Sequence, residues 1–150
     1  MDPAAANPCC ARVGEVMTAR VHTLGPDDFL YRAVRLFESE HFHHVVILEH
    51  GKILGVISDR DILKALSPFL GQSMMERPQD LATPRRRIHQ VMTRKPVTIH
   101  VDESTAEAAR KMLDQHVSCL PVVDDASAMV GILSMRDLIA QIAGASLTTA

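Results

Sequence analysis

Two segments of the sequence share a pattern of residue types that could bind a phosphate group. Residues 55–61 (GVISDRD) and 131–137 (GILSMRD) both contain a glycine, two apolar residues, a serine, a variable residue, an arginine and an aspartate. Each segment lies where a strand is expected to end and a helix to begin. The first turn of a helix presents backbone N–H groups without helical partners, together with positive partial charge. Such a turn, with a hydroxyl and a guanidinium beside it, suits a phosphate.

The predicted roles are the same in both copies of this pattern. The serine hydroxyls would donate to phosphate oxygens, the arginines would bind those oxygens as fixed forks, and the aspartates would accept from two ribose hydroxyls. The glycine would let a ligand approach the backbone closely. The predicted site residues are Ser58, Arg60 and Asp61 in the first copy and Ser134, Arg136 and Asp137 in the second.

The same residues could instead form a helix cap. Ser58 would then accept a hydrogen bond from the backbone N–H of Asp61, and the carboxylate of Asp61 would reach back toward Ser58. A single Ser-x-x-Asp sequence usually caps a helix and has no other role. Capping and ligand binding use compatible geometry, so both interpretations stay open.

The pattern is part of an internal duplication. Residues 16–18 (VMT) return as residues 91–93, which is 75 positions later, whereas Gly55 returns as Gly131, which is 76 positions later. One additional residue in a loop of the second copy explains the step. Repeats of this kind indicate one supersecondary unit used twice.

The duplication predicts the organisation of the whole chain. Two repeats, 11–66 and 87–143, are separated by a linker rich in proline, 67–86. The remaining residues, 1–10 and 144–150, are expected to be terminal tails.

Each repeat is expected to contain the element order β-α-β-β-α. In the first repeat a strand at 21–24 precedes a helix for which Asp27 is a candidate N-cap. Two further strands, 45–48 and 53–58, form a hairpin, and the first of them is apolar enough to be buried on both faces. A final helix follows the Ser-x-Arg-Asp pattern. The helical spacing of the apolar side chains predicts that one face of the first helix is buried; these residues are Leu30, Ala33, Val34 and Phe37.

The second repeat shows the same order of elements. A strand at 97–101 precedes a helix that either Asp102 or Ser104 could cap, and the hairpin strands lie at 120–123 and 129–134. The buried helix face is predicted to contain Thr105, Ala108, Ala109 and Met112.

The two halves of the chain resemble a pair of CBS (cystathionine-β-synthase) domains. The resemblance rests on V-M-T at residues 16–18 and 91–93, on L-P-V-V-D at residues 120–124, and on the two G-x-x-S-x-R-D segments. It covers nearly the whole chain apart from the tails and the linker. It implies an α/β (α+β) fold in which two β-α-β-β-α repeats pack sheet to sheet as one pseudo-twofold module, with two clefts between them. Stand-alone pairs of this type are common in bacteria.

The resemblance also implies a regulatory function. The clefts would bind an adenine nucleotide (AMP, ADP or ATP) as a regulatory ligand, with no required cofactor, and the module would signal to an unknown protein target by conformational or oligomeric change. Residues around the first and second strands would complete the nucleotide sites; these are Thr23, Leu24, His43, His44 and Val45 in the first repeat and Thr98, Ile99, Cys119 and Leu120 in the second.

The two sites are expected to differ in charge. The first repeat has His43 and His44 where the second has Ser118 and Cys119. More potential positive charge in the first site predicts unequal occupancy of the two sites by a phosphate-bearing ligand.

Composition argues against several other classes of protein. The net charge is −2 and aromatic residues make up 3% of the chain, so neither a basic field nor stacking platforms for nucleic acid are present. No segment approaches the roughly 18 consecutive apolar residues of a transmembrane helix, and the first residues do not resemble a secretory signal. Three cysteines, two of them adjacent, are a poor disulfide framework and indicate a cytoplasmic location.

Catalysis is not expected. The chain has no nucleophile elbow, no Walker loop and no recognisable pair of catalytic carboxylates. The alternative to a nucleotide-binding module is a ligand-free interaction scaffold, or a metal sensor that uses the cluster His41, His43 and His44. Adjacent side chains of a strand point to opposite faces, so His43 and His44 would not easily share one metal ion.

Assembly into a homodimer is expected from the final helix of each repeat. These helices carry more apolar residues than a short helix needs for its own core, and two such faces could pack around a twofold axis. The apolar residues are Ile62, Leu63 and Leu66 in the first repeat and Leu138, Ile139 and Ile142 in the second.

Overall fold

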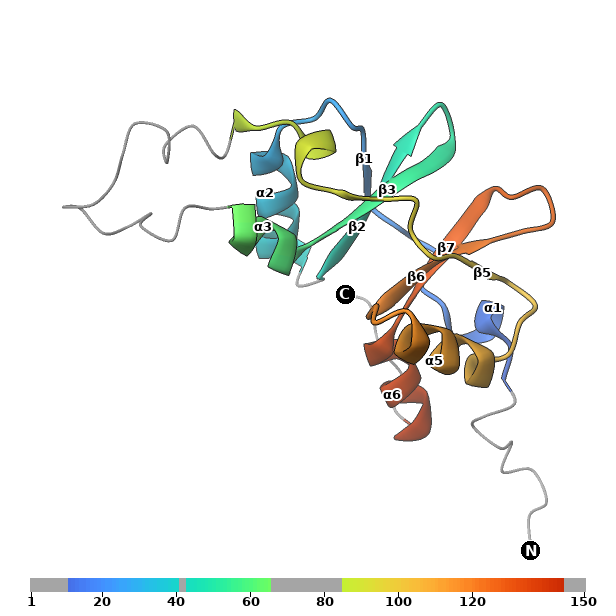
Figure 1. Ribbon diagram of the computed structural model, residues 1–150. Helices are drawn as coiled ribbons and strands as arrows, with labels where there is room; N and C mark the ends of the chain where they lie inside the picture. Colours follow the sequence, from blue (N-terminus) through green and yellow to red (C-terminus); the bar gives the residue numbers. More distant parts are fainter. Residues whose placement is uncertain (1–10, 41–42, 66–84, 145–150) are drawn as a thin grey trace, which may run out of the picture. The chain divides into compact units, whose positions relative to one another are not determined.

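The computed structural model describes residues 11–40, 43–65 and 85–144. They form two compact units (Figure 1): one lies within residues 22–96, and the other combines the residues up to Val21 with those from Val97 onward. The predicted N-terminal tail, most of the predicted linker and nearly all of the C-terminal tail lie outside the described residues.

The unit within residues 22–96 contains a four-stranded sheet in the order β1-β2-β3-β4. β1 is parallel to β2, and the other neighbours are antiparallel. Two helices and a short 3-10 helix accompany the sheet. The elements are β1 (Thr23–Leu24), α2 (Leu30–Glu40), β2 (His44–Glu49), β3 (Lys52–Ser58), α3 (Asp59–Ala65), η3 (Ile88–Gln90) and β4 (Thr93–Arg94).

The other unit repeats this arrangement around a three-stranded sheet in the order β5-β6-β7. A bridge between Thr18 and Ile132 lies beside β7, as β4 lies beside β3 in the first unit. The elements are α1 (Val13–Val16), β5 (Ile99–His100), α5 (Thr105–Asp114), β6 (Cys119–Val123), β7 (Met129–Ser134) and α6 (Met135–Ile142). The predicted order β-α-β-β-α is therefore present twice.

Each compact unit takes its V-M-T segment from the other sequence repeat. Thr18 exchanges two backbone hydrogen bonds with Ile132, with N···O distances of 2.9 and 3.0 Å, and Thr93 pairs with Val56. The compact units therefore do not coincide with the sequence repeats, because the first residues of each repeat pack with the hairpin of the other.

The glycine of each G-x-x-S-x-R-D segment is explained by this contact. A Cβ atom on Gly55 would lie 2.7 Å from both the Met92 sulfur and the Thr93 carbonyl oxygen. On Gly131 it would lie 2.5 Å from the Met17 sulfur. The close neighbour of both glycines is thus the V-M-T segment, whereas the sequence had suggested a bound ligand.

The two hairpins explain the change of offset between the repeats. The turn between β2 and β3 has φ angles of 49° at His50 and 76° at Gly51, as a two-residue type I′ turn requires. The pair Leu48–Ile53 in this hairpin corresponds to the pair Val123–Met129 in the hairpin of β6 and β7. The first pair encloses positions 49–52, and the second encloses positions 124–128, which is one residue more. The additional residue predicted for a loop lies here.

The helix α2 does not begin as predicted. It starts at Leu30, three residues after Asp27, so Asp27 is not its N-cap. Phe29, directly ahead of the helix, has no side-chain acceptor for a cap. The backbone N–H of Leu30 instead donates to the carbonyl oxygen of Arg86 at 2.8 Å. A hydrogen bond to a residue distant in sequence thus replaces the local cap. The residues around the helix start contain no pattern that could indicate this bond.

The sequence allowed either Asp102 or Ser104 to cap the equivalent helix α5, and the structure shows which of them does so. Ser104 is its N-cap, and the Ser104 Oγ accepts from the backbone N–H of Glu107 at 3.2 Å. The Glu107 carboxylate accepts in return from the backbone N–H and the hydroxyl of Ser104, both at 2.8 Å. These bonds favour the charged carboxylate and lower the pKa of Glu107.

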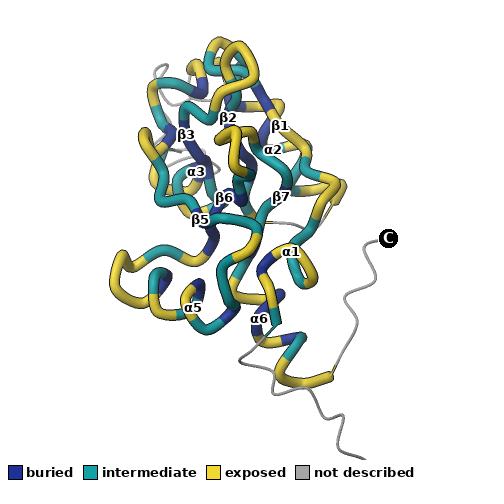
Figure 2. Tube along the Cα trace, turned by 90° about the vertical axis from the view of Figure 1, so that its right-hand side faces the viewer, coloured by how far each residue is buried: buried dark blue, intermediate teal, exposed yellow. Residues whose placement is uncertain are grey.

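The cores form between the sheets and the predicted helix faces. On α2, Leu30 and Ala33 are buried, and on α5 the buried residues are Thr105, Ala108 and Met112. Residues 45–47 of β2 have no exposed surface, which confirms that this part of the strand is buried on both faces. Figure 2 shows the buried residues along the strands and the exposed residues at loops and on outer helix surfaces.

Replacing Gly55 by alanine should destabilise the protein. The added Cβ overlaps the Met92 sulfur and a backbone carbonyl oxygen, and such overpacking costs about 1–3 kcal/mol. Gly25→Ala is the matched control, because its Cβ would lie 3.6 Å from Asp28, an ordinary contact. Urea unfolding should show a lower midpoint for Gly55→Ala than for Gly25→Ala. Equal midpoints would contradict the tight contact.

Candidate functional site

The strand registers bring the predicted site residues together at one end of each sheet. His44 at the start of β2 lies opposite Ser58, the last residue of β3. In the other unit Cys119 lies opposite Ser134, the last residue of β7. The helices α3 and α6 begin immediately after these serines. The serine, the helix start and the neighbouring strand therefore share one end of the sheet in both units.

Both Ser-x-Arg-Asp segments form a reciprocal helix cap. Asp61 Oδ2 accepts from the Ser58 backbone N–H at 2.8 Å and from the Ser58 hydroxyl at 2.7 Å. Asp137 Oδ2 accepts the equivalent bonds from Ser134, both at 2.6 Å. The aspartate N–H groups donate back to the serine oxygens at 3.2 and 3.3 Å. The capping interpretation is confirmed.

The cap leaves the serine and the aspartate with different possibilities for hydrogen bonding to a ligand. A serine hydroxyl has one proton to donate, and in both units that proton goes to the aspartate. The serine can therefore donate to a phosphate only if its hydroxyl turns away from the cap. The cap bonds of each aspartate all involve Oδ2, so they do not use the second oxygen of Asp61 or Asp137.

The two aspartates differ in burial. Asp137 is 8% exposed, whereas Asp61 is half-buried. The arginines of the motif, Arg60 and Arg136, lie in the first turns of α3 and α6 and are exposed. A carboxylate held by a cap and a solvent-facing guanidinium thus occur together at both helix starts.

The two histidines of the first repeat have different environments. His43 Nδ1 lies 2.8 Å from Asp59 Oδ2, and both side chains are solvent accessible. Burial lowers the pKa of His44, and the nearby carboxylates of Asp59 and Asp61 oppose this effect only in part. Burial thus disfavours the protonated form of His44, so this side chain adds little to the positive charge expected for this site.

The partner of His43 was not anticipated from the sequence. Asp59 occupies the variable position of the Ser-x-Arg-Asp pattern, where the second copy has Met135. The backbone nevertheless pairs in the same way in both units, because the N–H groups of Asp59 and Met135 donate to the carbonyl oxygens of His43 and Ser118 at 3.1 and 2.9 Å. Only the side chains differ.

Four of the predicted site residues belong to the hydrophobic cores. They are at most 7% exposed, so their side chains mainly stabilise the sheets. These residues are Leu24, Val45, Ile99 and Leu120. Thr23 is exposed, Thr98 is half-buried, and Cys119 is buried, as expected for a small apolar residue.

The metal-sensor alternative depends on a residue outside the described part of the chain, His41. Within residues 11–40, 43–65 and 85–144, no group of three or more histidine, cysteine, aspartate or glutamate side chains is placed to hold a metal ion. Over the same residues, no helix combines the length and the apolar character required to cross a bilayer.

The fold and the caps define a class of protein. A β-α-β-β-α unit occurs twice, and in each copy the second hairpin strand ends in a Ser-x-x-Asp cap. The family model "CBS domain" matches residues 13–68 and 88–144. The chain belongs to the CBS domain family, and the mixed α/β fold is that of CBS domain pairs.

Comparisons with individual proteins agree with this assignment. An L-aspartate semialdehyde sulfurtransferase of Methanocaldococcus jannaschii is 33% identical over 110 residues, or 73% of this chain. The chain spans 19% of that protein.

Two solved structures are similar over most of the chain. The CBS domain pair of protein MJ0100, in complex with 5′-methylthioadenosine and S-adenosyl-L-methionine, has a TM-score of 0.73 and 27% identity and covers 90% of this chain and 98% of its own. CBSX2 in complex with AMP has a TM-score of 0.71 and 23% identity, with coverages of 89% and 96%.

Acidification should lower the free energy of unfolding through His44. Because burial lowers its pKa in the folded chain, the unfolded chain binds the proton first as the pH falls through about 6.5. Stability is therefore lost below that pH until the folded-state pKa is reached. Urea unfolding at about pH 7.5 and about pH 5.5 should show a smaller loss for His44→Gln than for the parent chain.

The control for this measurement is His50→Asn. His50 is exposed and has a positive φ angle that asparagine tolerates. This variant should keep the pH dependence of the parent chain. If His44→Gln keeps it as well, burial of His44 is not its cause.

Proposed function

We propose that the chain is a regulatory module that binds an adenine nucleotide of the AMP, ADP or ATP class at the Ser-x-Arg-Asp ends of its sheets. The observation that carries the proposal is the cap. It holds the carboxylates of Asp61 and Asp137 in place through one oxygen and does not use the other. A carboxylate oxygen in this position is suited to accept from a ribose hydroxyl.

The neighbouring charges support the same assignment. The exposed guanidiniums of Arg60 and Arg136 suit phosphate oxygens, because a planar fork can bind two of them at once. In the first unit His43 adds a further group that can carry positive charge. Among similar structures, CBSX2 was solved with AMP, and the MJ0100 pair with two adenosine compounds. A phosphate-bearing adenosine ligand fits these groups best.

Regulation requires two states of the module with different affinity for the nucleotide. Binding then shifts the population between these states, and a protein target or the oligomeric state reports the shift. No part of this mechanism needs a reaction at the site or a required cofactor. The cysteine content favours a cytoplasmic location for such a module.

The nucleotide proposal is tested with variants that keep the cap. In Asp61→Asn and Asp137→Asn, the amide oxygen can accept the two bonds from serine, while the amide nitrogen replaces the second oxygen and cannot accept from ribose. Loss of a hydrogen bond to a charged group should weaken nucleotide binding about 10-fold or more at the altered site. Calorimetry with AMP, ADP and ATP measures this affinity.

The control variants are Ser58→Ala and Ser134→Ala. They remove part of the cap, at a cost of about 1 kcal/mol, but keep the carboxylates. We expect them to lower the thermal midpoint of unfolding while they change the affinity for nucleotide less than the asparagine variants do. Unchanged affinity in both asparagine variants, or no binding of any of the three nucleotides at millimolar concentration, would contradict the proposal.

We further propose a homodimer in which α3 and α6 form the interface. Leu63 on α3 and Ile139 on α6 occupy equivalent positions in the two repeats, and they are 68% and 60% exposed. Ile142 on α6 is 70% exposed. Exposed apolar residues at matching positions suit a second copy of the same surface, because a twofold interface is self-complementary.

Light scattering should give a mass of twice 16.5 kDa for the parent chain at micromolar concentration. Replacing Ile139 by lysine should shift the mass toward the monomer. Leu113→Lys is the matched control, since Leu113 is 67% exposed but lies on α5. A monomeric parent chain, or equal behaviour of the two variants, would exclude this interface.

A further inference from the structure

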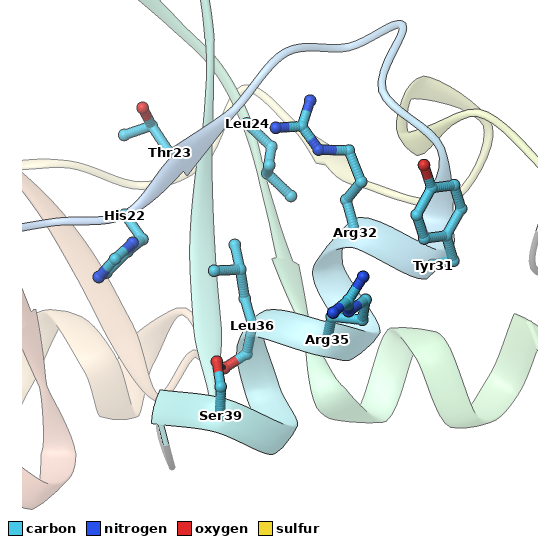
Figure 3. A pocket seen from close by; sticks show the side chains of 8 residues that line it. All are labelled: His22, Thr23, Leu24, Tyr31, Arg32, Arg35, Leu36 and Ser39. Atoms are coloured by element: carbon cyan, nitrogen blue, oxygen red, sulfur yellow. Dashed lines mark hydrogen bonds between the residues drawn. The ribbon is translucent and has the colours of Figure 1, made fainter.

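A groove on the first unit is distinct from the Ser-x-Arg-Asp segment. It lies between β1, the edge strand of the sheet, and α2, and it encloses about 510 Å³ (Figure 3). This volume is in the range of small-molecule sites. Its apolar floor is formed by Leu24 of β1 and Leu36 of α2. Both side chains lie between the strand and the helix in Figure 3.

The polar lining of the groove is cationic and rich in donors. Arg32 and Arg35 come from one face of α2, because residues three apart are neighbours on a helix. His22 and the hydroxyls of Thr23 and Tyr31 complete this lining on either side. Among the described residues that line the groove, none is acidic.

The two arginines are not equally committed to other contacts. Arg32 Nη1 pairs with Oδ1 of Asp28, which lies four residues earlier, just ahead of the helix. The hydrogen bonds and ion pairs found among the described residues include none from the guanidinium of Arg35. An anion in the groove would thus meet one uncompensated guanidinium, together with the remaining N–H groups of Arg32.

The corresponding helix face of the other unit has a different charge. A hollow of about 430 Å³ on α5, which no residue of β5 lines, includes Glu107, Arg110 and Asp114 at the positions that correspond to Arg32, Arg35 and Ser39. Its Lys111 is held by the Thr98 carbonyl oxygen at 3.2 Å and by Glu103 at 3.5 Å. The fold therefore accepts either charge on this helix face, so the cationic lining of the first groove is not a structural requirement.

We propose that the groove between β1 and α2 binds a small phosphomonoester, with the phosphate on Arg32 and Arg35 and an apolar body against Leu24 and Leu36. Two guanidiniums on one helix face match the double charge and the several oxygens of a phosphate better than the single charge of a carboxylate. The ring of Tyr31 provides further surface for a planar group. This site shares Thr23 and Leu24 with the predicted nucleotide site, but its phosphate contacts, Arg32 and Arg35, do not belong to that site.

The probe for this site is phenyl phosphate. It is titrated into the 15N-labelled chain at constant ionic strength, and binding is followed by the changes in amide chemical shift. We expect saturable shifts at residues 22–24 and 31–39. Phenyl phosphate should bind more tightly than inorganic phosphate, which lacks the apolar body, and more tightly than benzoate, which lacks the phosphate. Absence of saturable shifts, or shifts confined to residues 58–61 and 134–137, would overturn the proposal.

Matched variants separate this site from the caps. Arg35→Gln should weaken phenyl phosphate binding about 10-fold, whereas Arg110→Gln, at the equivalent position of the other unit, should leave it unchanged. Arg60→Gln, which alters the cationic side chain beside the cap, should also leave it unchanged. Equal weakening by Arg35→Gln and Arg110→Gln would show a non-specific charge effect, and loss of binding in Arg60→Gln would place the phosphate at the cap. Either result overturns the assignment.

Discussion

The rest of the fold depends on the contact between each V-M-T segment and a glycine in the hairpin of the other repeat. No atom larger than hydrogen fits on Gly55 or Gly131, because methionine sulfur and threonine carbonyl atoms occupy the space. The contact adds a strand-like segment to the hairpin strand that leads into the Ser-x-Arg-Asp cap. In both units this contact therefore holds in place the strand that ends at the candidate site.

The cap and the candidate binding site share a side chain without competing for the same oxygen. Asp61 and Asp137 use Oδ2 for the cap, and the serine hydroxyl donates its proton to the same oxygen. A carboxylate that is already held by two short hydrogen bonds has little freedom left to lose when a ligand binds. Helix formation and preorganisation of the acceptor are thus one event, which makes a stable cap compatible with a functional site.

Periodicity and duplication were sufficient to predict much of the fold. The hairpins, the buried faces of α2 and α5 and the additional loop residue all follow from local spacing, because each is decided by residues close together in sequence. The start of α2 was predicted wrongly at Asp27, since the carbonyl oxygen of Arg86 satisfies the helix from far along the chain. The exchange of V-M-T segments was missed for the same reason: spacing reveals a repeat but does not say with which copy a segment packs.

The candidate site was predictable in its residue types and less so in its side-chain environments. The Ser-x-Arg-Asp pattern indicated both possible roles, and the cap is now observed. The sequence could not show that His44 is desolvated, because strand register decides which face a residue occupies. The pairing of His43 with Asp59 depends equally on register, since it joins the start of one strand to the residue after another.

The exchange of leading segments has a consequence for a repeat on its own. A single repeat of this kind cannot complete its own sheet, because the segment that covers its glycine belongs to the other copy. A repeat produced alone would therefore need that segment from a second molecule, in the manner of a domain-swapped pair. In the tandem chain each repeat supplies the segment that the other lacks, so a break in the chain between the repeats would leave two partners that still complement each other.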